Sequence, residues 1–199
     1  MGPRSIEGHY EDYVAAAATV ELIKERAPSY DGVVIACYGD PGLFAAREIS
    51  PVPVMLMVCT VAHSFSAVTV LPRVVPLLED VVRHQGLESR CASIRATPLS
   101  VLDIEREPSS AEREIVTAAR AAAAEDGAEA ILLGCAGMGP LDRAVGSQVD
   151  VPVLDGVACA VKLLERPCDY GIATSSAAAF KEPEPKEILP YRDAAGASV

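Results

Sequence analysis

Residues 33–39 read Val-Val-Ile-Ala-Cys-Tyr-Gly, and residues 131–137 read Ile-Leu-Leu-Gly-Cys-Ala-Gly. Each stretch is a short apolar run that leads into a small residue, a cysteine, one further residue and a glycine. An apolar run without polar alternation is typical of a parallel strand that is buried on both faces. The two stretches therefore predict two buried strands, each with a cysteine at its carboxyl end.

A second signal repeats at a similar distance from each cysteine. Pro53 lies sixteen residues after Cys37, and Pro152 lies seventeen residues after Cys135. Each proline stands inside a Val-Pro-Val triplet. Two matched signals at matched spacing indicate an internal repeat.

Segments with the apolar spacing of helices alternate with short apolar runs along the chain. Helices are expected over residues 11–26, 43–48, 55–62, 74–84, 109–127 and 156–164, and strands over 32–37, 65–71, 91–96, 130–133 and 151–154. Ser109 and Glu112 have capping-box spacing at the start of the fifth helix. The alternation predicts an α/β fold with parallel sheet. We expect two pseudo-symmetric lobes, each a mostly parallel sheet flanked by helices: residues 1–63 with 157–199, and residues 64–156.

Ligands of parallel α/β sheets bind outside the carboxyl ends of the strands. Two facing lobes would therefore present Cys37 and Cys135 to one cleft. Such a pair suits inversion of a stereocentre, because one thiolate removes a proton while the other thiol delivers one to the opposite face. A free thiol has a pKa of about 8.5, and backbone N–H groups after Pro41 would favour the thiolate of Cys37. The alternative is that both are buried strand-end cysteines beside turn glycines.

The composition excludes several classes of protein. The 199 residues include 17 Lys and Arg against 28 Asp and Glu, and a formal net charge of −11 would repel nucleic acid. No apolar run reaches the ~20 residues of a membrane span, and the start has no secretory signal pattern, so we expect a cytoplasmic protein without a membrane partner. The six cysteines include no Cys-x-x-Cys pair and the histidines lack ligand spacing, so we expect free thiols and no metal site.

Five motifs along the chain are specific enough to compare with known families. They are Ala36-Cys-Tyr-Gly-Asp-Pro-Gly42, Thr69-Val-Leu-Pro-Arg73, Arg90-Cys-Ala-Ser-Ile-Arg-Ala96, Leu133-Gly-Cys-Ala-Gly-Met138 and Val151-Pro-Val-Leu-Asp-Gly156. With the opening Gly2-Pro-Arg-Ser-Ile-Glu7, they resemble the hydantoin racemase family of the aspartate/glutamate racemase superfamily. The resemblance implies a cofactor-free racemase with two α/β lobes, an active site in the cleft between them, and Cys37 and Cys135 as the acid/base residues.

A deprotonated substrate needs hydrogen-bond donors for its enolate oxygen, and the backbone N–H groups after each cysteine are the simplest source. The substrate-binding residues that we expect from the chain itself are Gly39, Asp40, Ala136 and Gly137 after the cysteines, and Thr69 at a strand end. The resemblance adds Ser5 and Ile6, whose family equivalents line the site. A helix cap or a supporting contact is the alternative role of Asp40.

The resemblance implies racemisation of a 5-substituted hydantoin or a related cyclic ureide such as allantoin. The substrate is then a small molecule whose C5–H is already acidified by the adjacent carbonyl, so neither metal nor cofactor is required. A homo-oligomer is expected, as is common for such enzymes. Two other functions remain open: a decarboxylase or cis–trans isomerase on the same scaffold, and a degenerate binding protein without catalysis.

The sequence departs from the family pattern at two places. Family members begin with a strand and an Asn-Pro-Asn-Thr turn, whereas this sequence starts about one β-α unit later. They also have several residues between the first Val-Pro-Val strand and the next helix, while here Met55 directly follows Val54. We therefore expect a break in the chain between Val54 and Met55, and a first lobe without its first strand.

Overall fold

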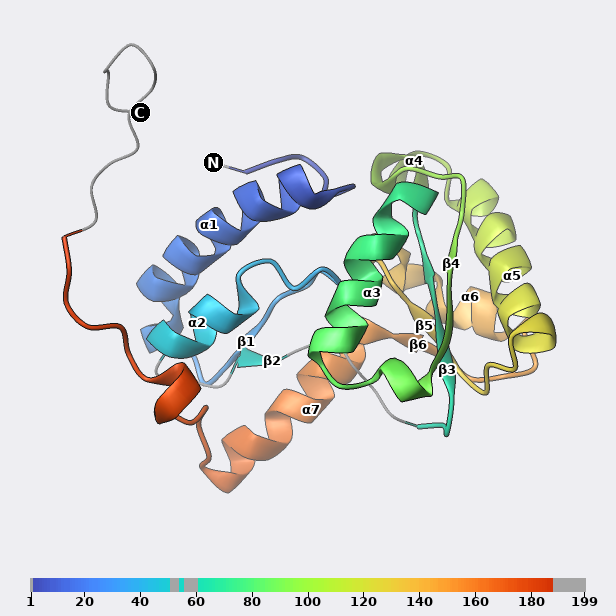
Figure 1. Cartoon of the computed structure of the whole chain (residues 1–199). Helices are drawn as coiled ribbons and strands as arrows, with labels where there is room; N and C mark the ends of the chain where they lie inside the picture. The colour runs from blue at the N-terminus through green and yellow to red at the C-terminus, as the bar shows by residue number, and fades with distance from the viewer. Residues whose placement is uncertain (1, 51–53, 56–60, 188–199) are drawn as a thin grey trace, which may run out of the picture.

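The computed structural model describes residues 2–50, 54–55 and 61–187, in which helices alternate with parallel strands (Figure 1). The helices are α1 (His9–Arg26), α2 (Leu43–Ile49), α3 (Val75–His84), α4 (Val101–Arg106), α5 (Pro108–Glu125), α6 (Asp142–Gly146) and α7 (Gly156–Tyr170). The strands are β1 (Val33–Val34), β2 (Val54–Met55), β3 (Phe65–Thr69), β4 (Cys91–Ala96), β5 (Ile131–Leu133) and β6 (Val153–Asp155). The predicted α/β fold with parallel sheet is confirmed. No helix in the described part of the chain is both long and apolar enough to cross a membrane.

The larger sheet has four parallel strands in the order β4-β3-β5-β6. Every residue of the inner strand β3 is buried, including the polar Ser66 and Thr69. Helix α3 lies on one side of this sheet and α5 and α6 lie on the other (Figure 1), as the usual right-handed crossover rule expects for this strand order. The core of this region includes Val68, Ile115 and Ile131, which are fully buried.

The smaller sheet consists of β1 and β2, which pair in parallel with Val33 opposite Val54. A separate group of five buried apolar residues lies beside it: Ile23, Ala27, Ile35, Leu43 and Ala46. In α1, which spans 18 residues, Ile23 is the buried one. Helix α7 contacts β1 as well as β6, and so it connects the two sheets. The assignment of lobe boundaries at residues 63 and 156 stays a prediction.

The region after the first Val-Pro-Val triplet differs from the prediction. Val54 and Met55 follow one another in β2, in consecutive register against Val33 and Val34, so the expected break between them is wrong. The helix expected over 55–62 is also wrong at Met55, which is extended, and at residues 61–62, which form a bend. The rest of that expected helix, and Pro53 itself, lie outside the described residues. Pairing with β1 determines the conformation of Val54 and Met55. The sequence alone shows a short apolar run, which is compatible with a helix or a strand.

The expected capping box lies at a different helix. Pro108 begins α5, and the preceding Glu107 makes no side-chain cap, so Ser109 lies inside the first turn. A capping box is formed instead at α4, where Ser100 accepts from the N–H of Asp103 and the Asp103 carboxylate accepts from the N–H of Ser100. The short helix α4 was missed because six residues carry too little apolar periodicity.

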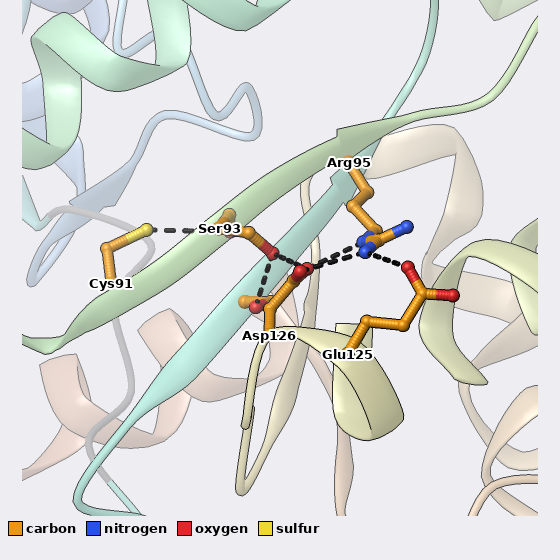
Figure 2. A network of polar contacts seen from close by, with 6 residues as sticks. Cys91, Ser93, Arg95, Glu125 and Asp126 are labelled. Atoms are coloured by element: carbon orange, nitrogen blue, oxygen red, sulfur yellow. Dashed lines mark hydrogen bonds and ion pairs between the residues drawn. The ribbon is translucent and has the colours of Figure 1, made fainter. Parts of the chain in front are cut away.

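The edge strand β4 is held to the end of α5 by an ion-pair network (Figure 2). The Arg95 guanidinium donates to Asp126 Oδ2 and Oδ1 at 2.6 and 2.8 Å and to Glu125 Oε2 at 2.7 Å. Ser93 Oγ donates to Asp126 Oδ2 at 2.6 Å and lies 2.8 Å from Ser66 Oγ on β3. These bonds lower the pKa of Asp126 to about 2. The network therefore ties an otherwise open sheet edge to the helix layer.

Candidate active site

The structure places both predicted cysteines just after strands. Cys37 follows β1, and Cys135 follows β5 as the residue before a 3₁₀ turn over Ala136–Leu141. The two thiols lie close enough for the charge of Cys135 to raise the pKa of Cys37. The internal repeat therefore brings together two cysteines that are 98 positions apart in the sequence.

The Cys37 loop, residues 35–42 between β1 and α2, is anchored in two places. Cys37 packs against the small apolar group beside β1, while the next residue, Tyr38, is 3% exposed and belongs to the core of the larger sheet. The N–H of Asp40 donates to the carbonyl of Cys37 at 3.0 Å, and the N–H of Leu43 donates to the carbonyl of Asp40 at 3.0 Å. These bonds turn the chain from β1 into α2.

Burial raises the pKa of the Cys37 thiol to about 12. The backbone N–H of Gly39 opposes this rise, because it donates to the sulfur and favours the thiolate. The nearby negative charges of Asp12, Cys135 and Asp40 raise the pKa further. Cys37 is therefore protonated at neutral pH.

The Cys135 loop, residues 134–141 between β5 and α6, provides more hydrogen-bond donors to its sulfur. Burial raises the pKa of the Cys135 thiol as well, but the backbone N–H groups of Gly137 and Met138 both favour the thiolate. The carboxylates of Glu7 and Glu105 act in the other direction and raise the pKa. Two donors in place of one make Cys135 the better candidate for a thiolate base.

Gly39 occupies a position that a side chain would disturb. A Cβ atom there would lie 3.0 Å from Asp12 Oδ1, 3.3 Å from Leu77 Cδ2 and 3.8 Å from Cys37 Sγ. A Cβ on Gly137 would meet Cys135 Sγ at 3.8 Å and no other atom within 4 Å. The first glycine is therefore required by close packing, whereas the second leaves open space beside its cysteine.

Asp40 is a buried carboxylate beside this loop. It is 8% exposed, its φ is 50°, and neither carboxylate oxygen has a hydrogen-bond partner. Burial raises the pKa of Asp40 to about 8; the positive charge of Arg47 opposes the rise and the charge of Asp12 adds to it. Asp12 also has a pKa raised by burial, although the positive charge of His9 opposes the rise. An uncharged Asp40 at neutral pH fits a supporting role better than direct contact with substrate.

The other predicted site residues occupy different positions. Thr69 is fully buried, and its hydroxyl donates to the carbonyl of Gly134 at 3.4 Å, so it supports the residue before Cys135. Ser5 and Ile6 are half-buried in the segment before α1, and Ala136 is half-buried at the start of the 3₁₀ turn. Contact of any of these with substrate stays a prediction.

A cavity of about 280 Å³ lies between α1, the Gly39–Phe44 segment and α3. Asp12, Gly39 and Asp40 line it, but neither cysteine does. The ring of Phe44 meets that of His84 edge-on at 6.4 Å, at the side of the cavity formed by α3. The cavity is thus a neighbour of the Cys37 loop and not the space between the two sulfurs.

Several charged residues near the thiols were not predicted from the sequence as site residues. Asp12 and Glu105 lie on helices, and nothing in their local sequence signals that they approach a cysteine. Asp155 N-caps α7 by accepting from Val157 N at 2.9 Å, and it lies against Gly139 in the Cys135 loop. Within residues 2–50, 54–55 and 61–187, no group of three or more His, Cys, Asp and Glu is arranged to hold a metal.

Comparisons with known proteins agree with the resemblance drawn from the motifs. The family description Asp/Glu/Hydantoin racemase matches residues 1–164. A hydantoin racemase of Pseudomonas sp. (strain NS671) is 43% identical over 197 residues, covering 95% of this chain and 79% of that protein.

Solved structures give the same result. An allantoin racemase from Pseudomonas fluorescens is 38% identical with a TM-score of 0.91, covering 95% of this chain and 83% of that one. An allantoin racemase from Klebsiella pneumoniae is 37% identical with a TM-score of 0.89, covering 95% of this chain and 80% of that one.

Proposed function

The chain belongs to the Asp/Glu/hydantoin racemase family, and from this premise we propose that it racemises a 5-substituted hydantoin or a related cyclic ureide by proton transfer between Cys37 and Cys135. The enzyme class is that of its relatives, which are named hydantoin racemase and allantoin racemase. The substrate is a small molecule. Assembly with further copies of the chain stays a prediction.

The observation that carries the proposal is the matched environment of the two thiols. Each sulfur receives the backbone N–H of the glycine two residues further on, and each is within electrostatic range of the other. A thiolate that is stabilised by backbone donors can act as a base, and a buried thiol can act as an acid. Two such groups provide one proton acceptor and one proton donor for opposite faces of a planar intermediate.

The reaction then proceeds by two proton transfers. The thiolate of one cysteine removes the C5 proton, which is acidified by the adjacent ring carbonyl, and the negative charge moves to the carbonyl oxygen. The thiol of the other cysteine protonates C5 from the opposite face. The backbone N–H groups of Gly39 and Gly137 donate to the sulfurs and so stabilise the thiolate that forms in each step. Because the carbonyl already acidifies C5–H, no cofactor is needed for this step.

Burial raises the pKa of both thiols, so we assign the starting roles from the number of backbone donors at each sulfur. Cys37, with its pKa raised to about 12, begins as the acid. Cys135, with two backbone donors, begins as the base. After one turnover, Cys135 carries the proton and Cys37 is the thiolate. The starting state is restored when the enzyme converts the opposite enantiomer or when the two thiols exchange protons with solvent.

Racemisation and solvent exchange together test the proposal. Each pure enantiomer of allantoin and of an alkyl-substituted hydantoin is incubated with the protein in D₂O, and spontaneous racemisation in buffer is subtracted. We expect loss of optical rotation and entry of deuterium at C5 for at least one of these substrates. Loss of CO₂ from a carboxylated substrate would replace this function with a decarboxylase. Binding without deuterium entry would replace it with a binding protein.

A further inference from the structure

The segment before α1 connects the two sheet regions of the molecule. Figure 1 shows the chain near its N-terminus reaching toward α4 before it turns into α1. Ser5 and Ile6, the two site residues that the family resemblance added, lie in this segment, and both are half-buried. The position of the segment therefore affects any substrate contact that these residues make.

Two contacts fix the end of this segment on the larger sheet region. Glu7 Oε1 accepts from the backbone N–H of Val101, the first residue of α4, at 3.1 Å. The next residue, Gly8, is buried and packs closely against the Arg73 side chain. A Cβ atom on Gly8 would lie 2.8 Å from Arg73 Nη2. Glu7 and Val101 are 94 positions apart, so this bond joins distant parts of the chain.

The same Glu7 lies within electrostatic range of Cys135. Its charge and that of Glu105, on α4, both disfavour the Cys135 thiolate. The other groups near this thiol are the backbone donors Gly137 and Met138 and, across the site, the thiol of Cys37. Glu7 thus combines a structural bond with a charge near the sulfur, whereas Glu105 has the charge without a bond to the segment.

We infer that Glu7 is a positioning residue for the reaction: it clamps the segment that carries Ser5 and Ile6 onto α4 and holds a carboxylate within reach of Cys135. This inference rests on the proposed function as far as catalysis is concerned. The clamp and the charge, however, each have a consequence that is measured without turnover. Breaking the clamp exposes the Val101 amide, and removing the charge makes the Cys135 thiol more acidic.

Two substitutions at one position separate the clamp from the charge. Glu7→Gln removes the charge but keeps an oxygen that accepts from Val101, whereas Glu7→Ala removes both. The pH dependence of Cys135 alkylation by iodoacetamide, followed by mass spectrometry of its peptide, reports the thiol. Hydrogen exchange of residues 99–104 reports the clamp, and KM and kcat for racemisation report the site.

In both Glu7 variants, we expect the midpoint of Cys135 alkylation to fall by roughly half a pH unit. Only Glu7→Ala should speed hydrogen exchange at residues 99–104 and raise KM, by about tenfold. Glu105→Gln is the matched charge control and should lower the alkylation midpoint without faster exchange. Glu21→Gln, on the exposed side of α1, should change none of these quantities.

An unchanged alkylation midpoint in Glu7→Gln would overturn the charge role. An unchanged exchange rate and KM in Glu7→Ala would overturn the clamp. If the wild-type chain does not racemise any substrate, the proposed function fails, while the alkylation and exchange measurements still decide the inference about Glu7.

Discussion

The Cys37 loop and the Cys135 loop carry the same Cys-x-Gly motif on different supports. The Cys135 loop follows a buried strand of the four-stranded sheet and directs two backbone N–H groups at its sulfur. The Cys37 loop follows a strand of the two-stranded sheet, directs one N–H group at its sulfur, and lies beside the buried carboxyl group of Asp40 and the half-buried one of Asp12. A shared motif therefore does not give the two thiols the same surroundings, because the number of backbone donors and the neighbouring charges differ.

The largest effect on racemisation is expected when either cysteine sulfur is removed. Cys37→Ser and Cys135→Ser should each reduce racemisation by roughly 10³-fold or more, because each thiol serves one face of the substrate. The two variants should still exchange the C5 proton of opposite enantiomers, measured by NMR in D₂O. Cys91→Ser, in the edge strand β4, is the control that keeps activity. Full racemisation by either site variant would contradict the two-base mechanism.

The two glycines should respond unequally to an added methyl group. Gly39→Ala places Cβ at 3.0 Å from Asp12 Oδ1 and 3.3 Å from Leu77 Cδ2, so these side chains must give way beside the loop that directs the N–H to Cys37, and we expect kcat to fall by about tenfold. Gly137→Ala meets no atom closer than 3.8 Å and should change kcat by less than about threefold. Steady-state kinetics on the two variants measures the contrast. Equal losses would show that the close contact at Gly39 is unimportant.

Asp40→Asn should remove a pH-dependent destabilisation of the Cys37 loop. The folded-state pKa of about 8 exceeds the unfolded value of about 4, so the folded protein loses stability as the pH rises from 4 to 8. The variant lacks this titrating group. The free energy of unfolding of the variant minus that of the wild type should therefore increase by roughly 1 to 3 kcal/mol between pH 4 and pH 8. Urea unfolding at several pH values gives this difference. Asp80, a half-exposed residue that lines the same cavity, gives the control variant Asp80→Asn.

The ion-pair network of the larger sheet should show the opposite pH dependence and a smaller effect. The pKa of Asp126 is lowered to about 2, so its stabilisation is present above pH 4 and is lost as the pH falls toward 2. Asp126→Asn should therefore lower the free energy of unfolding by about 1 kcal/mol at pH 7 and by only a small part of this at pH 2, where the carboxyl group is half protonated in the folded state. Glu125→Gln, whose side chain is 66% exposed, should cost less than this at pH 7. A pH-independent effect of Asp126→Asn would assign its role to shape and not to charge.

The sequence predicted the parts of the molecule that depend on local apolar pattern. The strand before Cys135 is buried, as its apolar run without alternation predicts. The strand before Cys37 is also present, but it covers Val33–Val34 alone of the predicted 32–37 and is half-buried, because it belongs to a two-stranded sheet. The conformation of Met55 was mispredicted because a short apolar run does not distinguish strand from helix until a partner strand is known. The bond between Glu7 and Val101 and the packing of Asp12 against Gly39 were not predictable, since they join residues far apart in sequence through tertiary packing.

The apolar group beside the small sheet is much smaller than the core of the four-stranded sheet. Regions with few buried apolar contacts open locally at lower free energy than the rest of a protein. On heating, α1, α2 and β1 should therefore open as a unit before the four-stranded sheet melts. Asp12 and Gly39 would separate in that opening while most of the secondary structure persists. The temperature at which activity disappears is then expected to lie below the melting temperature measured by far-ultraviolet circular dichroism. The difference between the two temperatures should depend on the stability of the small apolar group beside β1 and not on that of the protein as a whole.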